Sequence, residues 1–120
     1  MIFHGWQVYM DKLEYWRQLI QQVLTEYSRI KPVNGDIEVV TIFDLESDRY
    51  QLVYMGWENR VRLYGCSIHV DLKDGKIWIE NDSTEVGIAN ELVERGIRRS
   101  DIVLAYQAPY LRQFTQFAIG

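Results

Sequence analysis

The dipeptide Asp74-Gly75 separates two stretches in which apolar and polar residues alternate. Asp-Gly favours a type I′ turn, because both central residues of that turn need a positive φ. A two-residue loop of this kind joins antiparallel strands and fixes which residues face one another. The predicted pairs are Lys73–Lys76, Leu72–Ile77, Asp71–Trp78, Val70–Ile79 and His69–Glu80.

This register assigns each side chain to one face of the sheet, because successive side chains of a strand point to opposite faces. The face that we expect to form the core carries small or apolar residues, namely Cys66, Ile68, Val70, Leu72, Ile77 and Ile79. The other face carries mostly polar residues, namely Ser67, His69, Asp71, Trp78 and Glu80.

A long helix is predicted before the sheet, from about Met10 to Pro32. Its apolar residues recur at spacings of 3 and 4, which places them on one face of a helix. Asp11 and Glu14 would lie in its first turn, and Arg29 and Lys31 in its last. The apolar stripe is Leu13, Trp16, Ile20, Val23, Tyr27 and Ile30.

Four stretches rich in β-branched and aromatic residues follow, at 36–44, 49–57, 61–72 and 76–80. Their short connections predict an antiparallel meander. Residues 81–96 read as a second helix, with Ser83 or Thr84 as the N-cap and Gly96 after its end.

The C-terminal part reads as short elements. Residues 100–106 form either a short last strand or a buried extended segment, and Pro109 can open a short helix with Leu111, Phe114 and Phe117 on one face. The predicted fold is therefore α+β: a long N-terminal helix, a four-stranded antiparallel meander, a second helix, and a short C-terminal strand or helix.

Length and charge narrow the class of protein. The chain has 120 residues, the length of one domain, and a formal net charge of −4 with a pI of about 5.1. An acidic domain lacks the basic face that DNA binding requires, so direct nucleic-acid binding is disfavoured. The lone Cys66 excludes an internal disulfide and favours a reducing cytoplasm. No apolar run reaches the roughly 20 residues of a membrane span.

The polar face of the hairpin has two interpretations. His69, Asp71 and Glu80 are residue types that serve as acids, bases or metal ligands, so a small hydrolase or a metalloprotein is one of them. However, a flat two-strand face provides no pocket. The favoured interpretation is a partner interface made by His69, Asp71, Trp78 and Glu80, with Trp78 as its apolar anchor.

Four arginines suggest a third, weaker candidate. Arg60 and Arg62 lie near Trp57 and Tyr64 in the sequence, while Arg98 and Arg99 follow the second predicted helix. Basic residues mixed with aromatic ones can bind single-stranded nucleic acid. Acidic neighbours dilute this basic patch, namely Glu58, Glu94 and Asp101. A solvated surface is favoured over a DNA-binding module.

The order and spacing of several segments resemble the XisI-like family. The most specific are "YQLVYMGW", "HVDLKDGKIWI" and "PYLRQFTQFA". The resemblance runs from Met10 to about Ala118, so we expect residues 1–9 to be an N-terminal extension and residues 10–120 to form a single XisI-like domain.

The resemblance implies a function in DNA rearrangement. The family takes its name from a factor that controls excision of the fdxN element during heterocyst differentiation. A separate site-specific recombinase exchanges the strands, and a second protein, XisH, is also required. By resemblance, this chain is an accessory factor with an XisH-like partner and indirect contact with the recombinase complex. No catalytic residues, cofactor, metal or membrane contact are implied, and self-association into a homo-oligomer is left open.

Overall fold

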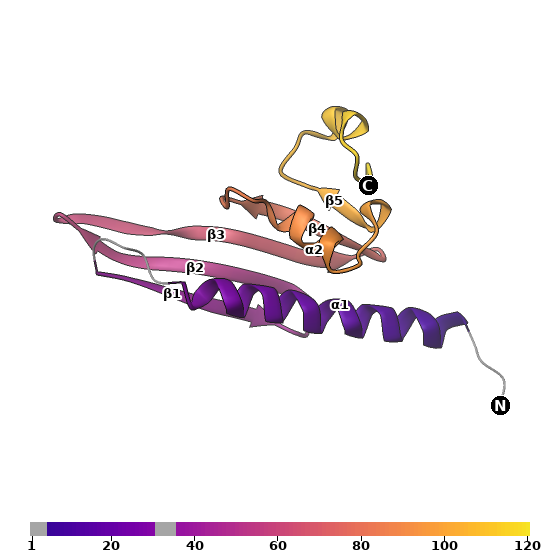
Figure 1. Ribbon diagram of the computed structural model, residues 1–120, viewed down its shortest axis with the longest axis horizontal. Helices are drawn as coiled ribbons and strands as arrows, with labels where there is room; N and C mark the ends of the chain where they lie inside the picture. The colour runs from indigo at the N-terminus through magenta and orange to yellow at the C-terminus, as the bar shows by residue number, and fades with distance from the viewer. Residues whose placement is uncertain (1–4, 31–35) are drawn as a thin grey trace.

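The computed structural model describes the backbone of residues 5–30 and 36–120. Apart from the short 3₁₀ helix η1, which was not predicted, its elements follow one another as predicted in kind and order, and Figure 1 shows them on the ribbon. They are α1 (Gly5–Ser28), β1 (Asp36–Asp44), β2 (Arg49–Glu58), β3 (Val61–Lys73), β4 (Lys76–Asp82), α2 (Ile88–Glu94), the 3₁₀ helix η1 (Arg99–Asp101), β5 (Ile102–Leu104) and the 3₁₀ helix η2 (Pro109–Phe114). The α+β fold class is thus confirmed.

The sheet has five strands in the order β1-β2-β3-β4-β5. The first four form the predicted antiparallel meander, and β5 pairs with β4 in parallel. Of the two readings of residues 100–106, the short strand is confirmed at Ile102–Leu104, and all three of its residues are buried. The parallel direction arises because the chain passes through α2 between β4 and β5, and this crossover makes the sheet mixed.

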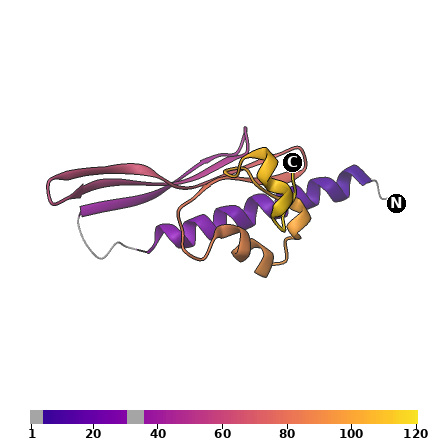
Figure 2. The same cartoon turned by 90° about the horizontal axis from the view of Figure 1, so that it is seen from above.

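Both helices cover the same face of the sheet, as Figure 2 shows from above. The core between them contains the predicted β3 and β4 residues except Cys66, together with Trp16, Ile20 and Val23 of the predicted α1 stripe. Leu13 and Tyr27 of that stripe are partly buried against the core, whereas Ile30 follows the end of α1 and is 65% exposed, so its assignment to the buried stripe is wrong. Fully buried members include Ile20, Val23, Ile68, Val70, Ile77, Ile79, Ile88 and Leu92. The distal part of the β2–β3 hairpin extends beyond the end of α1 in both views (Figures 1 and 2).

The helix boundaries differ from the prediction. α1 begins at Gly5, so the predicted extension is helical from that residue and neither Asp11 nor Glu14 lies in the first turn. Its last turn, which ends at Ser28, holds no basic residue. Lys31 and Pro32 lie outside the described residues.

The second helix is shorter than predicted because an aspartate turn precedes it. Asp82 accepts hydrogen bonds through Oδ1 from Thr84 N at 2.9 Å and through Oδ2 from Ile88 N at 2.7 Å. α2 therefore starts at Ile88, and neither Ser83 nor Thr84 is its N-cap. Gly96 has a φ of 101°, which confirms the predicted left-handed position after the helix.

The C-terminal elements confirm one prediction and correct another. Pro109 opens a short helix, as predicted, and this helix is of the 3₁₀ type. Leu111, Phe114 and Phe117 do not share one buried face, since Phe114 is 77% exposed while Phe117 packs against the core. A tighter helix that ends at Phe114 breaks the spacing on which that prediction relied.

Candidate functional site

The face of the sheet opposite the two helices, which we call the open face, carries the residues that the sequence singled out. Strand pairing arranges its side chains in five rows across the strands. From the β2–β3 turn toward the β3–β4 turn, the rows are Asp36–Trp57–Arg62, Glu38–Met55–Tyr64, Val40–Val53–Cys66, Ile42–Gln51–His69–Asn81 and Asp44–Arg49–Asp71–Trp78. We call the first three the tip rows and the last two the base rows.

The predicted β3–β4 turn explains the last of these rows. Asp74 and Gly75 have φ values of 52° and 72°, as a type I′ turn requires. The pairs up to Val70–Ile79 have the predicted register. His69 and Asp71 therefore lie on the open face together with Trp78.

Glu80 departs from the prediction. A β-bulge shifts the register between His69 and Val70, so His69 pairs with Asn81 and Glu80 is the extra residue. The predicted His69–Glu80 pair is therefore wrong. Asn81 stabilises the irregular region, because its Nδ2 donates to the backbone oxygens of Cys66 and Ser67 at 2.9 and 3.2 Å.

A second bulge moves Cys66 to the open face. It lies between β2 and β3, where Ser67 is the extra residue and Cys66 pairs with Val53. Cys66 was predicted to be a core residue, yet it is half-buried and outside the core cluster. Burial raises the pKa of its thiol, which favours the protonated form and agrees with a packing role.

His69 is engaged at both ring nitrogens. Its Nε2 lies 2.8 Å from Asp71 Oδ1, and its Nδ1 lies 3.4 Å from Gln51 Nε2. A neutral ring that donates from Nε2 and accepts at Nδ1 satisfies both partners. Asp71 is only 8% exposed, so this contact also provides a partner for a buried carboxylate. Neither ring nitrogen is free for a substrate or a metal in this arrangement.

The metal interpretation lacks a third ligand. Within the described residues, no group of three His, Cys, Asp or Glu side chains is placed to hold an ion. Of the proposed set, the structure brings His69 and Asp71 together and leaves Glu80 at the bulge. The geometry therefore favours a binding surface over a metal centre.

Trp78 is partly covered by its own chain. Its Nε1 donates to Lys73 O at 3.1 Å, and Lys73 Nζ and the Arg112 guanidinium lie 4.2 and 5.7 Å from the ring centroid. Arg112 is held in place by hydrogen bonds to Gln107 O and Ala105 O, both at 3.0 Å. The C-terminal segment thus reaches the open face at its base rows, and Trp78 is half-exposed between two cations.

The four arginines do not form one patch. Arg60 and Arg62 lie at the β2–β3 turn, whereas Arg98 and Arg99 adjoin η1, which leads directly into β5 and is distant from that turn (Figure 1). Arg62 lies between two aromatic rings, 5.4 Å from the centroid of Trp57 and 6.0 Å from that of Tyr64. Arg98 pairs with Asp101 at 3.3 Å. The sequence alone could not show whether these two pairs of arginines come together in the fold.

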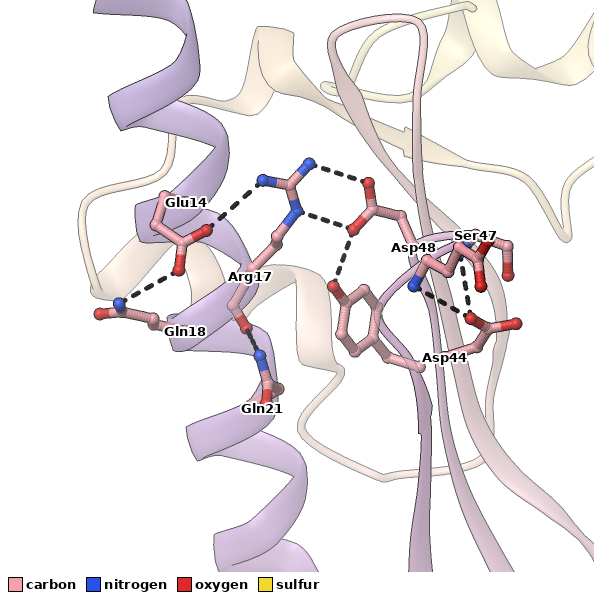
Figure 3. A network of polar contacts seen from close by, with 9 residues as sticks. Glu14, Arg17, Gln18, Gln21, Asp44, Ser47 and Asp48 are labelled. Atoms are coloured by element: carbon pink, nitrogen blue, oxygen red, sulfur yellow. Dashed lines mark hydrogen bonds and ion pairs between the residues drawn. The ribbon is translucent and has the colours of Figure 1, made fainter.

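One polar network, shown in Figure 3, was missed by sequence reasoning. Arg17 of α1 makes two hydrogen bonds to Asp48, at 2.8 and 3.1 Å, and the hydroxyl of Tyr50 donates to Asp48 at 2.9 Å. Arg17 holds the pKa of Asp48 below its usual range, and burial raises the pKa of Tyr50. The network joins α1 to the β1–β2 turn, where Asp48 has a φ of 56°. Its role is to fix the helix on the sheet.

A shallow hollow lies between α1 and the region of α2. Its volume is about 360 Å³, and it is lined by Glu26, Tyr27, Ile30, Val86 and Glu91. Tyr27 donates to Glu91 at 2.8 Å, and burial raises the pKa of Tyr27 to about 12. Tyr27 and Ile30 belong to the apolar stripe predicted for the first helix, but none of the candidate site residues named from the sequence lines this hollow. No described helix is long and apolar enough to cross a membrane.

The geometry defines a small α+β domain with helices on one face of its sheet and an open second face. The family described as XisI protein matches residues 10–119. The crystal structure of a XisI-like protein from Anabaena variabilis ATCC 29413 superposes with a TM-score of 0.84 at 42% identity, over 90% of this chain and 99% of that one. The chain therefore belongs to the XisI family, which confirms the resemblance seen in the sequence.

A second solved structure extends this comparison. It is the crystal structure of the fdxN element excision controlling factor XisI, also from Anabaena variabilis ATCC 29413. It is 32% identical, has a TM-score of 0.78, and covers 91% of this chain and 99% of its own. No curated protein matches the chain.

Proposed function

We propose that this chain is an accessory factor that controls site-specific excision of a DNA element and acts by binding an XisH-like protein. A separate recombinase breaks and rejoins the DNA. The observation that carries the proposal is the likeness, over 91% of the chain, to a protein named as an excision controlling factor. The chain contributes binding energy and no bond-breaking group.

The charge distribution supports action through a protein. The formal net charge is −4, and the four candidate arginines lie in two separate places, at the β2–β3 turn and at η1. A duplex-binding surface needs several cations on one face to displace counterions. Here the tip rows carry Asp36 and Glu38 on β1 as well as Arg62 on β3, so the local charge is mixed. Mixed charge around aromatic side chains suits a protein partner.

The base rows are the proposed contact for the XisH-like protein. Trp78 provides an apolar ring at their edge, and Asp71 and Gln51 orient His69 beside it. A half-exposed Trp surrounded by polar groups has the character of an interface anchor. The rigid His69–Asp71 contact lowers the entropic cost of ordering the surface on binding.

Replacing Trp78 with Ala is expected to weaken binding of an XisH-like protein by about 30-fold, as loss of an interface anchor worth roughly 2 kcal/mol would do. Titration calorimetry with the purified partner measures this change. The variant should stay folded, because the loss of two cation–π contacts and one hydrogen bond costs about 1–2 kcal/mol.

Trp57→Ala is the matched control, since Trp57 is on the same face but in the tip rows. Its affinity for the XisH-like protein should stay near that of the unmodified chain. An unchanged affinity in Trp78→Ala would move the contact away from the base rows. Absence of any complex would refute the proposed partner.

A further inference from the structure

The tip rows form an apolar strip edged by opposite charges. Trp57 and Tyr64 are 54% and 68% exposed, and they belong to the two rows nearest the β2–β3 turn. Val53 at the centre of the face is only 6% exposed, although it does not belong to the core cluster. Contiguous exposed apolar surface of this kind marks a contact site.

The charges on this strip are separated by strand. On the β1 side, the first two rows begin with Asp36 and Glu38. On the β3 side, the first row ends with Arg62, whose guanidinium lies between Trp57 and Tyr64. None of the ion pairs between described residues involves Asp36 or Arg62. The strip therefore carries an acidic edge and a basic edge on either side of an aromatic and aliphatic centre.

We propose that the tip rows bind the tip rows of a second copy of this chain, face to face, about a two-fold axis parallel to β2. This rotation exchanges the β1 side of one copy with the β3 side of the other. Asp36 of each copy then faces Arg62 of the other, and β2 lies over β2. The contact is isologous and produces a closed dimer. It is independent of the proposed excision function.

Charge selects this axis over the alternative. An in-plane axis perpendicular to the strands, through the second row, would place β1 over β1 and thus Glu38 of one copy over Glu38 of the other. Like charges would then meet. With the axis parallel to β2, two symmetric Asp36–Arg62 pairs form, and the aromatic side chains of β2 meet across the interface. Two twisted sheets pack in this aligned way at a small angle.

A second class of ligand competes for this surface. Aromatic rings with an intervening arginine also stack on unpaired bases. Asp36 and Glu38 in the same two rows repel a phosphate backbone, and the net charge of −4 acts in the same direction. The acidic edge that opposes nucleic acid is the element that a second copy requires. The observations therefore favour a copy of the chain.

Sedimentation velocity of the full chain over a concentration series tests the dimer. A dissociation constant of about 1–100 µM is expected, because three strands offer less area than a standard interface of roughly 800 Å² per partner. Arg62→Asp should weaken the dimer by at least about 30-fold, since two ion pairs are replaced by two repulsive contacts. Asp36→Arg should weaken it to a similar extent.

The charge-exchanged double variant Asp36→Arg/Arg62→Asp should restore dimerisation to within about threefold of the unmodified chain. Arg99→Asp, the same charge change in η1 and outside the tip rows, should leave it unaffected. A chain that is monomeric throughout the series overturns the proposal. A dimer that both Arg62→Asp and Asp36→Arg leave intact also overturns it. Binding of a single-stranded oligonucleotide by a monomeric chain, lost in Arg62→Asp, would assign the strip to nucleic acid instead.

Discussion

Replacing Ile77 with Ala is expected to lower the free energy of unfolding by about 3 kcal/mol, within the roughly 2–5 kcal/mol range of buried large-to-small changes. Ile77 is fully buried in β4 and lies between Leu72 of β3 and Ile102 of β5. Truncation removes apolar burial and leaves a cavity under two paired strands. Denaturant titration followed by Trp fluorescence measures the loss.

Ile119→Ala provides the control, because Ile119 is 65% exposed and loses the same atoms. Its unfolding free energy should change by less than about 0.5 kcal/mol. Val70→Ala should resemble Ile77→Ala, with a smaller loss for the smaller side chain. If Ile77→Ala leaves the midpoint of the titration unmoved, the assignment of this face to the core is wrong.

Replacing Asp48 with Ala is expected to lower the free energy of unfolding by about 2 kcal/mol. The change removes the acceptor of both Arg17 hydrogen bonds and of the Tyr50 hydroxyl, while the Tyr50 residue is 0% exposed (Figure 3). A buried donor without an acceptor costs roughly 1–3 kcal/mol. The ion pair is partly exposed and adds less than a buried one would.

The pH dependence of the same site has a definite sign. The Arg17 hydrogen bonds lower the pKa of Asp48 in the folded protein. The stabilisation is therefore fully present above the unfolded pKa of about 3.9, and it is lost as pH falls through the lower folded value. Asp48→Asn retains an acceptor but does not titrate, so its stability should fall less between neutral pH and about pH 3. Equal acid sensitivity in both proteins would contradict this role of Asp48.

Local signals in the sequence were sufficient to predict the strand pairing and the core face of much of the sheet. The Asp74-Gly75 turn specifies its own geometry through positive φ at both positions, so the pairs next to it could be predicted. The alternation of Val70 and Leu72 with polar residues then identified the core face. Periodicity identified α1 in the same way, because the stripe from Trp16 to Val23 depends only on spacing.

The bulges could not be predicted because they depend on contacts distant in sequence. Counting outward from a turn assumes one residue on each strand for each step. Glu80 breaks this count, and the side-chain amide of Asn81 compensates by bonding the backbone oxygens of Cys66 and Ser67. The parallel strand β5 and the Arg17–Asp48 network likewise depend on packing between segments distant in sequence.

About half of the residues of the candidate site could therefore be predicted from the sequence. His69, Asp71 and Trp78 follow from the turn, whereas Gln51 and Asn81 enter through neighbouring strands. The continuation of the open face to Trp57 and Arg62 needed the β2–β3 register, which contains a bulge of its own. The two halves of that face are thus joined only in the folded sheet.

The central claim is that this chain controls excision without performing it. The most direct measurement is amplification of the excision junction in cells that carry the fdxN element, its recombinase and an XisH-like protein but lack their own XisI. Expression of this chain should produce the junction, and Trp78→Ala should reduce its yield. The recombinase should be required in every case. No junction with this chain, in cells where the original XisI restores it, would contradict the account, and so would a junction formed without the recombinase.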